Sequence, residues 1–257
     1  MRRLDRTGVE APPDWQAIVD GAFPDAAAFW KKARLFEKLA EHGARRKRGF
    51  VRYAPGVLPL NAQGQPELPP VWQKDDGVRK VIAGMSHGFC AYCQSQVSSN
   101  HAGKRGKERP PGQVEHFRPK SRFPAQAYDW GNYFLACAGC NCAKQDKWPI
   151  GGYVRPDEGN PGRRFVFKEN GEVKARKGDE AAKSTVRDID LRRYWLVEQR
   201  RGAIETHLRV VRLAVGRKGV KLADLLVEDR VAFSEAINQN VRRLWRKRQK
   251  TKQPSAE

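Results

Sequence analysis

Apolar residues recur at helical intervals near both ends of the chain. In residues 25–42, one stripe of a predicted amphipathic helix is formed by Phe29, Ala33, Phe36 and Ala40. Asp25 stands at the start of this helix and Gly43 just beyond its end, where a capping residue and a helix-ending glycine are expected. Residues 53–75 are interrupted by Pro and Gly, which predicts extended structure, and a short helix is expected near residues 76–86.

The C-terminal half begins with a hairpin signal and continues with helices. Asn170-Gly171, a dipeptide typical of tight β-turns, lies between Phe165-Val166-Phe167 and Glu172-Val173-Lys174. From about residue 184, helical spacing returns in Leu191, Trp195, Ile204, Leu208, Val211 and Leu213. Gly216 and Gly219 interrupt that pattern, and a last helix is expected over residues 221–248. We therefore expect an α+β protein that is mostly helical.

Charge adds a class of partner to this picture. Lys and Arg number 50 against 29 Asp and Glu, a formal net charge of +21. Such an excess favours a polyanionic partner, meaning DNA, RNA or an acidic membrane face. Apolar residues make up 39% of the chain, which is enough to bury a core.

The chain shows no membrane or secretion signal. No apolar stretch approaches the ~20 residues that a membrane-spanning helix needs. The charged residues 1–6 are not followed by the apolar run of a secretory signal. We expect a cytoplasmic protein, a compartment where disulfides are rare and clustered cysteines more often bind metal.

Four of the five cysteines form two C-x-x-C pairs, Cys90 with Cys93 and Cys137 with Cys140. Each pair curls the backbone so that both sulfurs face one point, and two pairs make the tetrahedral thiolate site of structural zinc. The alternatives are buried apolar cysteines or a redox dithiol, and neither pair has the βαβ context of a redox site. The fifth, Cys142, is expected to be a small buried residue on a helix rather than a further ligand.

The 43 residues between the two pairs hold the candidate chemistry. Residues 99–113 are rich in Gly, Pro, Lys and Arg, which fits a solvated linker and a phosphate-contacting loop equally well. Beyond them Glu115 and His116 are adjacent, and Asn132 follows sixteen residues later. Asn141 comes directly after the second cysteine pair. An imidazole titrating near pH 7 can take a proton from water, and carboxylate and amide oxygens suit Mg²⁺ or Mn²⁺.

Residues 90–148 resemble the HNH endonucleases, in which a ββα-metal site lies inside a four-cysteine zinc frame. More narrowly, they resemble the PtuB-type effector nucleases of Septu and retron anti-phage defence systems. The resemblance covers about a quarter of the chain and is carried by CAYC…VEHFRPKS…YDWGNYFLACAGCNCAKQDKWP. It implies a small ββα core with a four-cysteine zinc site, and the apolar patterns described above place helical regions on its N- and C-terminal sides.

The resemblance also assigns roles to the motif residues. It makes His116 the general base at the end of the first strand and Glu115 the metal ligand that precedes it. Asn132 matches the residue that holds the loop and orients the base, and Asn141 completes the metal site. Glu stands where Asp is more usual, and Asn replaces a final His. Both changes keep oxygen donors, which favours catalytic Mg²⁺ or Mn²⁺ beside the structural Zn²⁺.

Each motif residue also has an ordinary structural interpretation. Glu115 and His116 are compatible with a surface ion pair, and Asn141 with a turn cap. Asn132 is compatible with the N-cap of the helix that carries the second cysteine pair. Candidate phosphate contacts, with solvated charge as the alternative, are Arg118, Lys120 and Lys144.

Three consecutive segments are expected. Residues 1–75 form a helical and extended region, residues 76–150 the HNH core with its zinc knuckles, and residues 151–257 a hairpin followed by helices. The last segment ends in seven basic residues and no acid over residues 242–252, suited to nucleic acid, an acidic partner or solvent.

The leading hypothesis is a metal-dependent endonuclease that hydrolyses DNA as a defence effector. By resemblance it acts with an ABC-type ATPase, similar to PtuA. One alternative is an HNH nuclease that cleaves RNA, for example tRNA, because RNA presents the same phosphates. The other is a non-catalytic zinc-knuckle protein that binds nucleic acid.

Overall fold

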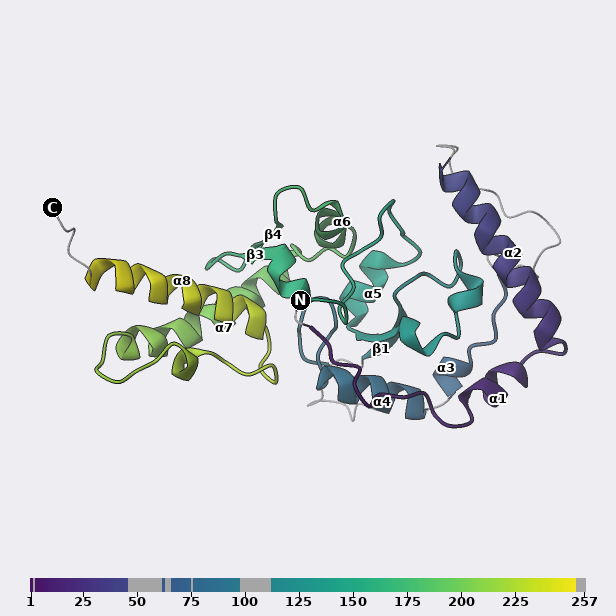
Figure 1. The fold of residues 1–257 in the computed structure, drawn as a ribbon, viewed down its shortest axis with the longest axis horizontal. Coiled ribbons are helices and arrows are strands. Elements are labelled where there is room, and N and C mark those ends of the chain that lie inside the picture. The colour runs from purple at the N-terminus through teal and green to yellow at the C-terminus, as the bar shows by residue number, and fades with distance from the viewer. Residues whose placement is uncertain (2, 46–61, 63–65, 75, 98–111, 253–257) are drawn as a thin grey trace. The chain divides into compact units, whose positions relative to one another are not determined.

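The computed structural model describes residues 1, 3–45, 62, 66–74, 76–97 and 112–252 (Figure 1). Within these residues the protein is α+β with helices predominating, so the predicted fold class is confirmed. Most of the expected basic loop at 99–113 and much of the expected extended segment at 53–75 lie outside the described residues.

The chain divides into two compact units. Unit 1 comprises Met1–Leu4, Phe89–Gln96 and Tyr153–Glu257, and unit 2 comprises Asp5–Gly88 and Val97–Gly152. Both units are discontinuous in sequence, whereas the predicted division has three consecutive segments. That three-segment division stays a prediction.

Unit 2 is built around a two-stranded antiparallel sheet. Its strands are β1 (Gln113–His116) and β2 (Tyr133–Ala136), with Glu115 opposite Phe134 and His116 opposite Tyr133. Two 3₁₀ turns, η1 (Pro124–Gln126) and η2 (Trp130–Asn132), lie in the connection between the strands, and α5 (Ala138–Lys144) follows β2 directly. The result is a strand–strand–helix arrangement in which α5 contacts β1.

Within the described residues, four helices precede this sheet. They are α1 (Trp15–Asp20), α2 (Ala26–Arg45), α3 (Val71–Lys74) and α4 (Asp76–Ser86). The Asp25 carboxylate accepts a hydrogen bond from the Ala28 N–H (2.9 Å), so α2 begins where the sequence predicts, although it runs three residues further. The helix expected at 76–86 is α4, which packs on both strands, while α2 packs on η1. The shared core includes Val19, Phe29, Phe36, Trp72, Ile82, Tyr133 and Leu135.

Unit 1 contains the predicted hairpin and the C-terminal helices. Its elements are η3 (Pro161–Arg164), β3 (Phe165–Phe167), β4 (Val173–Ala175), α6 (Glu180–Asp188), α7 (Tyr194–Ala214), η4 (Ala223–Leu225) and α8 (Ser234–Lys252). Strands β3 and β4 pair antiparallel around Asn170-Gly171, which confirms the hairpin. Gly171 has φ +84°, and a Cβ there would lie 2.2 Å from the Val197 carbonyl oxygen. Only glycine fits this close approach to α7.

The last helix begins later than its sequence pattern predicts. The pattern predicts a helix from residue 221, but α8 begins at Ser234, after η4 and a run of turns. The Asn238 side chain accepts from the Val227 N–H and donates to the Val227 carbonyl, both at 2.9 Å. The backbone polar groups of Val227 are therefore satisfied by a side chain of α8 instead of by a helical turn of their own, so tertiary contacts override the local pattern.

Candidate functional site

The first cysteine pair lies in a tight turn that backbone hydrogen bonds hold in place. The Gln94 N–H donates to the Cys90 carbonyl (3.0 Å), and the Cys90 N–H donates to the Ser95 carbonyl (2.9 Å). Gln94 adopts φ +67°, which curls the chain back after Cys93. The Ser95 N–H then donates to the Cys93 sulfur at 3.5 Å, an interaction that favours a thiolate.

The second pair lies at the start of α5. Cys137 is the N-cap of this helix, and its sulfur accepts a hydrogen bond from the Cys140 N–H at 3.4 Å. The helix N-terminus places partial positive charge beside both sulfurs, which also favours the thiolate form.

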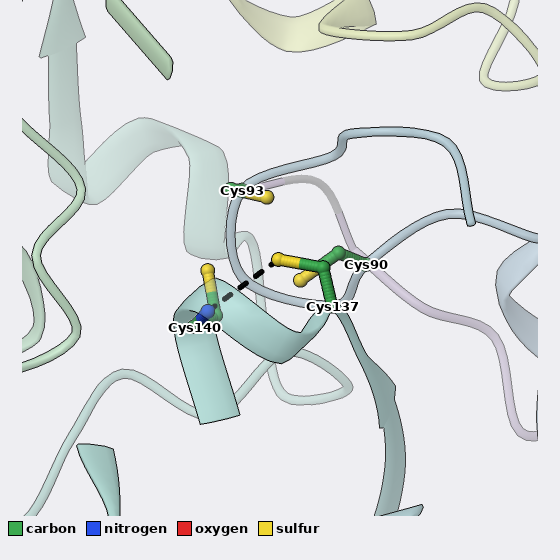
Figure 2. A group of neighbouring side chains, drawn as sticks. All are labelled: Cys90, Cys93, Cys137 and Cys140. Carbon is green, nitrogen blue, oxygen red and sulfur yellow. Dashed lines mark hydrogen bonds between the residues drawn. The ribbon is translucent and has the colours of Figure 1, made fainter. Parts of the chain in front are cut away.

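The four sulfur atoms of these pairs lie within 4.8 Å of one another (Figure 2). Four thiolates at about 2.3 Å from a zinc ion in a tetrahedron have sulfurs about 3.8 Å apart, so the donor set and spacing fit structural zinc. Cys90, Cys93 and Cys140 are buried, as expected for a closed structural site. The predicted four-cysteine metal cluster is therefore confirmed as a set of positioned ligands.

Cys142 differs from its expected environment. It lies on α5 as predicted and outside the metal cluster, but its side chain is exposed rather than buried. The sulfurs of Cys140 and Cys142 lie on different faces of the helix, because residues two apart are about 200° apart around its axis. All five cysteines are described, and none forms a disulfide.

The two faces of β1 carry different chemistry, because successive strand residues point to opposite sides. On the side of α5, the Asn141 Nδ2 donates to the Gln113 Oε1 (2.7 Å), and the Lys144 ammonium pairs with the Glu115 carboxylate (2.5 Å). The His116 side chain points to the other side. The structure thus brings Glu115 and Asn141 onto one side of the strand and the candidate base onto the other.

His116 is held in one orientation by three neighbours. Its Nε2 lies 2.9 Å from the Ala127 carbonyl oxygen. The rings of Trp72 and Tyr133 pack edge-on against the imidazole, with ring centres 4.6 and 5.1 Å from its centre. Because a carbonyl only accepts hydrogen bonds, Nε2 carries the proton, and the neutral ring keeps its lone pair on Nδ1. Burial lowers the pKa of His116 to about 3, so the imidazole is neutral at physiological pH. The neutral ring can accept a proton at Nδ1, and burial makes it a weaker base than an exposed imidazole.

Asn132 ties together the connection between the two strands. Its Oδ1 accepts from the Arg118 N–H (2.7 Å), and its Nδ2 donates to the carbonyls of Arg118 (3.0 Å) and Gln126 (2.9 Å). It does not cap α5, whose N-cap is Cys137. Every polar atom of this buried amide is used to hold the segment that carries Ala127, the partner of His116.

Glu37 of α2 is a contributor that the sequence did not reveal. Its carboxylate accepts from the Ala125 N–H (2.8 Å) and from the Gln126 side-chain amide (3.3 Å). Burial raises the pKa of Glu37 despite these bonds. The contacts join residues far apart in the chain, so no local pattern signals them. They fix the two residues that immediately precede Ala127.

The Glu115–Lys144 pair departs from the expectation that Lys144 contacts phosphate. Lys144 is fully buried, and its ammonium bonds both Glu115 and the His116 carbonyl (2.8 Å). A buried ammonium beside a buried carboxylate neutralises it and is out of reach of an external phosphate. Glu115 therefore pairs with Lys144 and not, as in the surface alternative, with His116.

The two other candidate phosphate contacts are more open. Arg118 is exposed and bonds the Gln126 side chain (3.1 Å). Lys120 is partly buried, and its ammonium lies 5.8 Å from the centre of the Trp72 ring, the same ring that meets His116. Burial lowers the pKa of Lys120. Both cations lie on the segment that follows His116 and connects β1 to β2.

Comparison with known proteins gives one distant relative. No family model matches the chain. The chain is similar to the Septu protein PtuB of Bacillus mycoides (strain KBAB4), at 23% identity over 188 residues. The match covers 61% of this chain and 61% of that protein, so the chain spans less than two thirds of the length of this curated relative. The similarity supports the Septu branch of the resemblance.

Within the described part of the chain, no helix has both the length and the apolar character to cross a bilayer.

Replacing Cys137 is expected to remove zinc and stability together. Cys137→Ser deletes one of four thiolates, and binding energy at a structural zinc site is also folding energy. Cys142→Ser, on the exposed side of the same helix, is the matched control and should keep its zinc and its melting temperature. Metal analysis beside thermal unfolding measures both. Equal zinc in the two variants would contradict the assignment.

Proposed function

We propose that this protein is a metal-dependent endonuclease of the HNH type that hydrolyses phosphodiester bonds in DNA. The observation that carries the proposal is His116, at the end of β1 in a strand–strand–helix unit, with Nε2 bonded to Ala127 and Nδ1 left as the acceptor. The similarity to a Septu PtuB protein supports it independently.

Hydrolysis of a phosphodiester needs an activated water and a counter-charge for the phosphate. His116 takes a proton from the attacking water at Nδ1, a role that a neutral imidazole fixed at its other nitrogen can fill. Asn132 keeps the Ala127 carbonyl in place and so keeps the imidazole in that orientation. Arg118 and Lys120 supply the counter-charge for the phosphate.

Mg²⁺ or Mn²⁺ would be held by oxygen atoms of Glu115 and Asn141, the hard ligands that these ions prefer. When bound, the ion would stabilise the negative charge of the phosphate and the leaving oxygen. The ammonium of Lys144 now stands beside the Glu115 carboxylate at 2.5 Å. Because Glu115 and Asn141 lie on the opposite side of β1 from His116, binding of a divalent cation beside the scissile phosphate requires that this pair open and that the Glu115 carboxylate turn toward the base.

We further propose that the nuclease is a defence effector that acts with an ATPase partner. The similarity to the Septu protein PtuB supports a defence role, and the resemblance of the motif implies an ABC-type, PtuA-like subunit. Plasmid DNA and total tRNA, each with Mg²⁺, Mn²⁺ or neither and with or without the ATPase, distinguish DNA from RNA as the substrate.

Replacing the base is expected to abolish cleavage and spare binding. His116→Ala should slow cleavage by ~10²–10⁴, the usual loss on removing a general base, with unchanged zinc content. His207→Ala is the control, because His207 also bonds a backbone carbonyl, that of Leu225 at 2.9 Å, outside the site. Undiminished cutting by His116→Ala would overturn the assignment, and no cutting by the wild type would favour a binding module.

The Glu115–Lys144 pair provides a test of the divalent site that does not need activity. Lys144→Met removes the ammonium that pairs with the buried Glu115 carboxylate, and breaking a buried ion pair in this way costs ~3–5 kcal/mol of stability. Mg²⁺ or Mn²⁺ should then raise the melting temperature of this variant more than that of the wild type, because the ion replaces the ammonium. Lys144→Met combined with Glu115→Gln has no charge to satisfy and should show no such response. Equal responses would exclude Glu115 as a ligand.

Glu37 is expected to act on the rate through the position of His116. Glu37→Ala frees Ala125 and Gln126, and losing about one hydrogen bond of orientation should lower kcat roughly tenfold with KM unchanged. Glu37→Gln keeps an oxygen that can accept from the Ala125 N–H, so it should recover most of the rate. Lys38→Ala, on the exposed face of α2, is the control. A change in KM alone would contradict a positioning role.

A further inference from the structure

Unit 1 contains two contrasting sets of arginines. Three arginines of α7 form ion pairs, Arg201 with Glu198 (2.5 Å), Arg209 with Glu205 (2.9 Å), and Arg212 with Glu169. A second set is made of Arg163, Arg176, Arg242 and Arg246. Among the described residues, no carboxylate forms an ion pair with any of these four.

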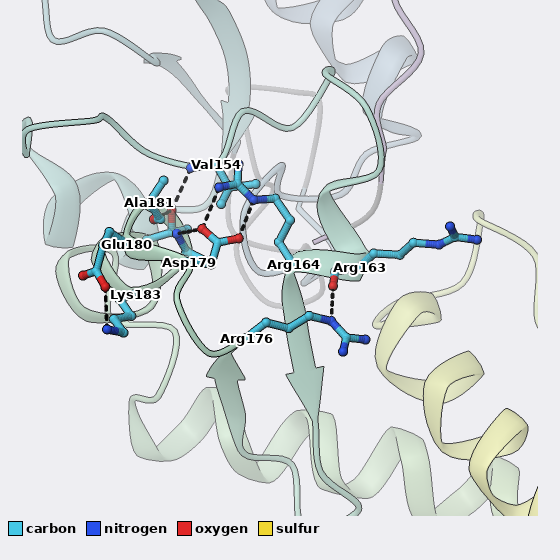
Figure 3. Close-up of polar contacts among 10 residues, drawn as sticks. Val154, Arg163, Arg164, Arg176, Asp179, Glu180, Ala181 and Lys183 are labelled. Carbon is cyan, nitrogen blue, oxygen red and sulfur yellow. Dashed lines mark hydrogen bonds and ion pairs between the residues drawn. The ribbon is translucent and has the colours of Figure 1, made fainter.

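The second set, called here the arginine surface, gathers on neighbouring elements. Arg176 donates from Nε to the Arg163 carbonyl, and Figure 3 shows both side chains extending away from the Asp179 cluster on the same side. The Gln239 side chain of α8 donates to the Gly162 carbonyl (3.2 Å), which brings η3 against this helix. Arg242 and Arg246 follow Gln239 by three and seven residues. They therefore share its helix face, beside Arg163.

A role as an ion-pair partner inside the protein does not explain these arginines, although the Nε of Arg176 bonds the Arg163 carbonyl. The neighbouring Arg164 shows what such a role looks like, because it turns inward and binds both oxygens of Asp179, the N-cap of α6, at 2.6 and 2.7 Å (Figure 3). The dipole of α8 favours cations in its last turn, but Arg163 and Arg176 are not on that helix. Arg242 and Arg246 repel one another at a spacing of four residues, a cost that a bound anion removes.

We propose that the arginine surface binds the phosphodiester backbone of a nucleic acid, in addition to Arg118 and Lys120 of unit 2. Guanidinium groups bind phosphate through two parallel hydrogen bonds, and four of them on one surface suit a chain of phosphates. That the bound nucleic acid is the substrate of the nuclease rests on the proposed function. The binding itself does not.

The composition of the surface favours a nucleic acid over an acidic protein. Protein interfaces have an apolar, often aromatic centre, whereas nucleic-acid interfaces are polar and strongly positive. The large exposed apolar side chains of unit 1 include Tyr194, Trp195, Val210 and Leu213, all on α7. The arginine surface combines charge with none of these anchors.

Matched charge removal tests the proposal. One variant carries Arg163→Gln, Arg242→Gln and Arg246→Gln, and the control carries Arg201→Gln, Arg209→Gln and Arg212→Gln, so that each loses three positive charges. Both are made in the His116→Ala background, and binding to duplex DNA and duplex RNA is followed by anisotropy against salt. The slope of log K against log salt should become shallower by about one unit for each lost contact in the first variant, and stay unchanged in the control.

Further measurements separate the possible outcomes. Lysine at the same three positions should restore the salt slope, because it keeps the charge. With His116 intact, the first variant should raise KM and leave kcat unchanged. An unaltered salt slope, or lost binding of poly-glutamate with DNA binding retained, would overturn the proposal. If the first variant shows the shallower salt slope but the wild-type protein never cleaves nucleic acid, the proposed function would be overturned and this inference would stand.

Discussion

The hydrogen bond from His116 to the Ala127 carbonyl is the interaction on which the candidate site depends. It sets both the tautomer and the direction of the imidazole, and it exists only if the segment between β1 and β2 keeps one conformation. That segment is short of regular structure, with two 3₁₀ turns, so side chains must satisfy its backbone. Asn132, Tyr133 and Glu37 do so, the Tyr133 hydroxyl donating to the same Ala127 carbonyl at 2.7 Å.

Features written in local patterns were predictable from the sequence. The cysteine pairs, the Asn170-Gly171 hairpin and the start of α2 at Asp25 each depend on residues a few positions apart. Features that depend on distant partners were not. The start of α8 is set by Asn238 bonding Val227, eleven residues earlier, and apolar spacing carries no trace of that contact.

In the candidate site, too, local features were predictable and contacts between distant residues were not. The motif gives the identity of Glu115, His116 and Asn132, and strand alternation alone separates the first two onto opposite sides of β1. Burial of Lys144 and the reach of Glu37 across from α2 follow from packing between elements. A lysine in a basic sequence is ordinarily predicted to lie on the surface, and only the structure shows that Lys144 neutralises a buried carboxylate.

The basic residues behind the net charge of +21 lie in different environments and do not contribute equally to the electrostatic field. Arginines of α7 are paired on the surface, where each ion pair contributes little to stability and leaves little field. Lys144 is paired in the interior, where its loss would remove the counter-charge that it gives to the buried Glu115 carboxylate. The arginine surface is left with neither kind of partner among the described residues. Unlike these paired cations, the arginine surface can attract a polyanion at long range, so the sequence-based inference from overall charge to nucleic acid depends on how the basic residues are paired and not only on their number.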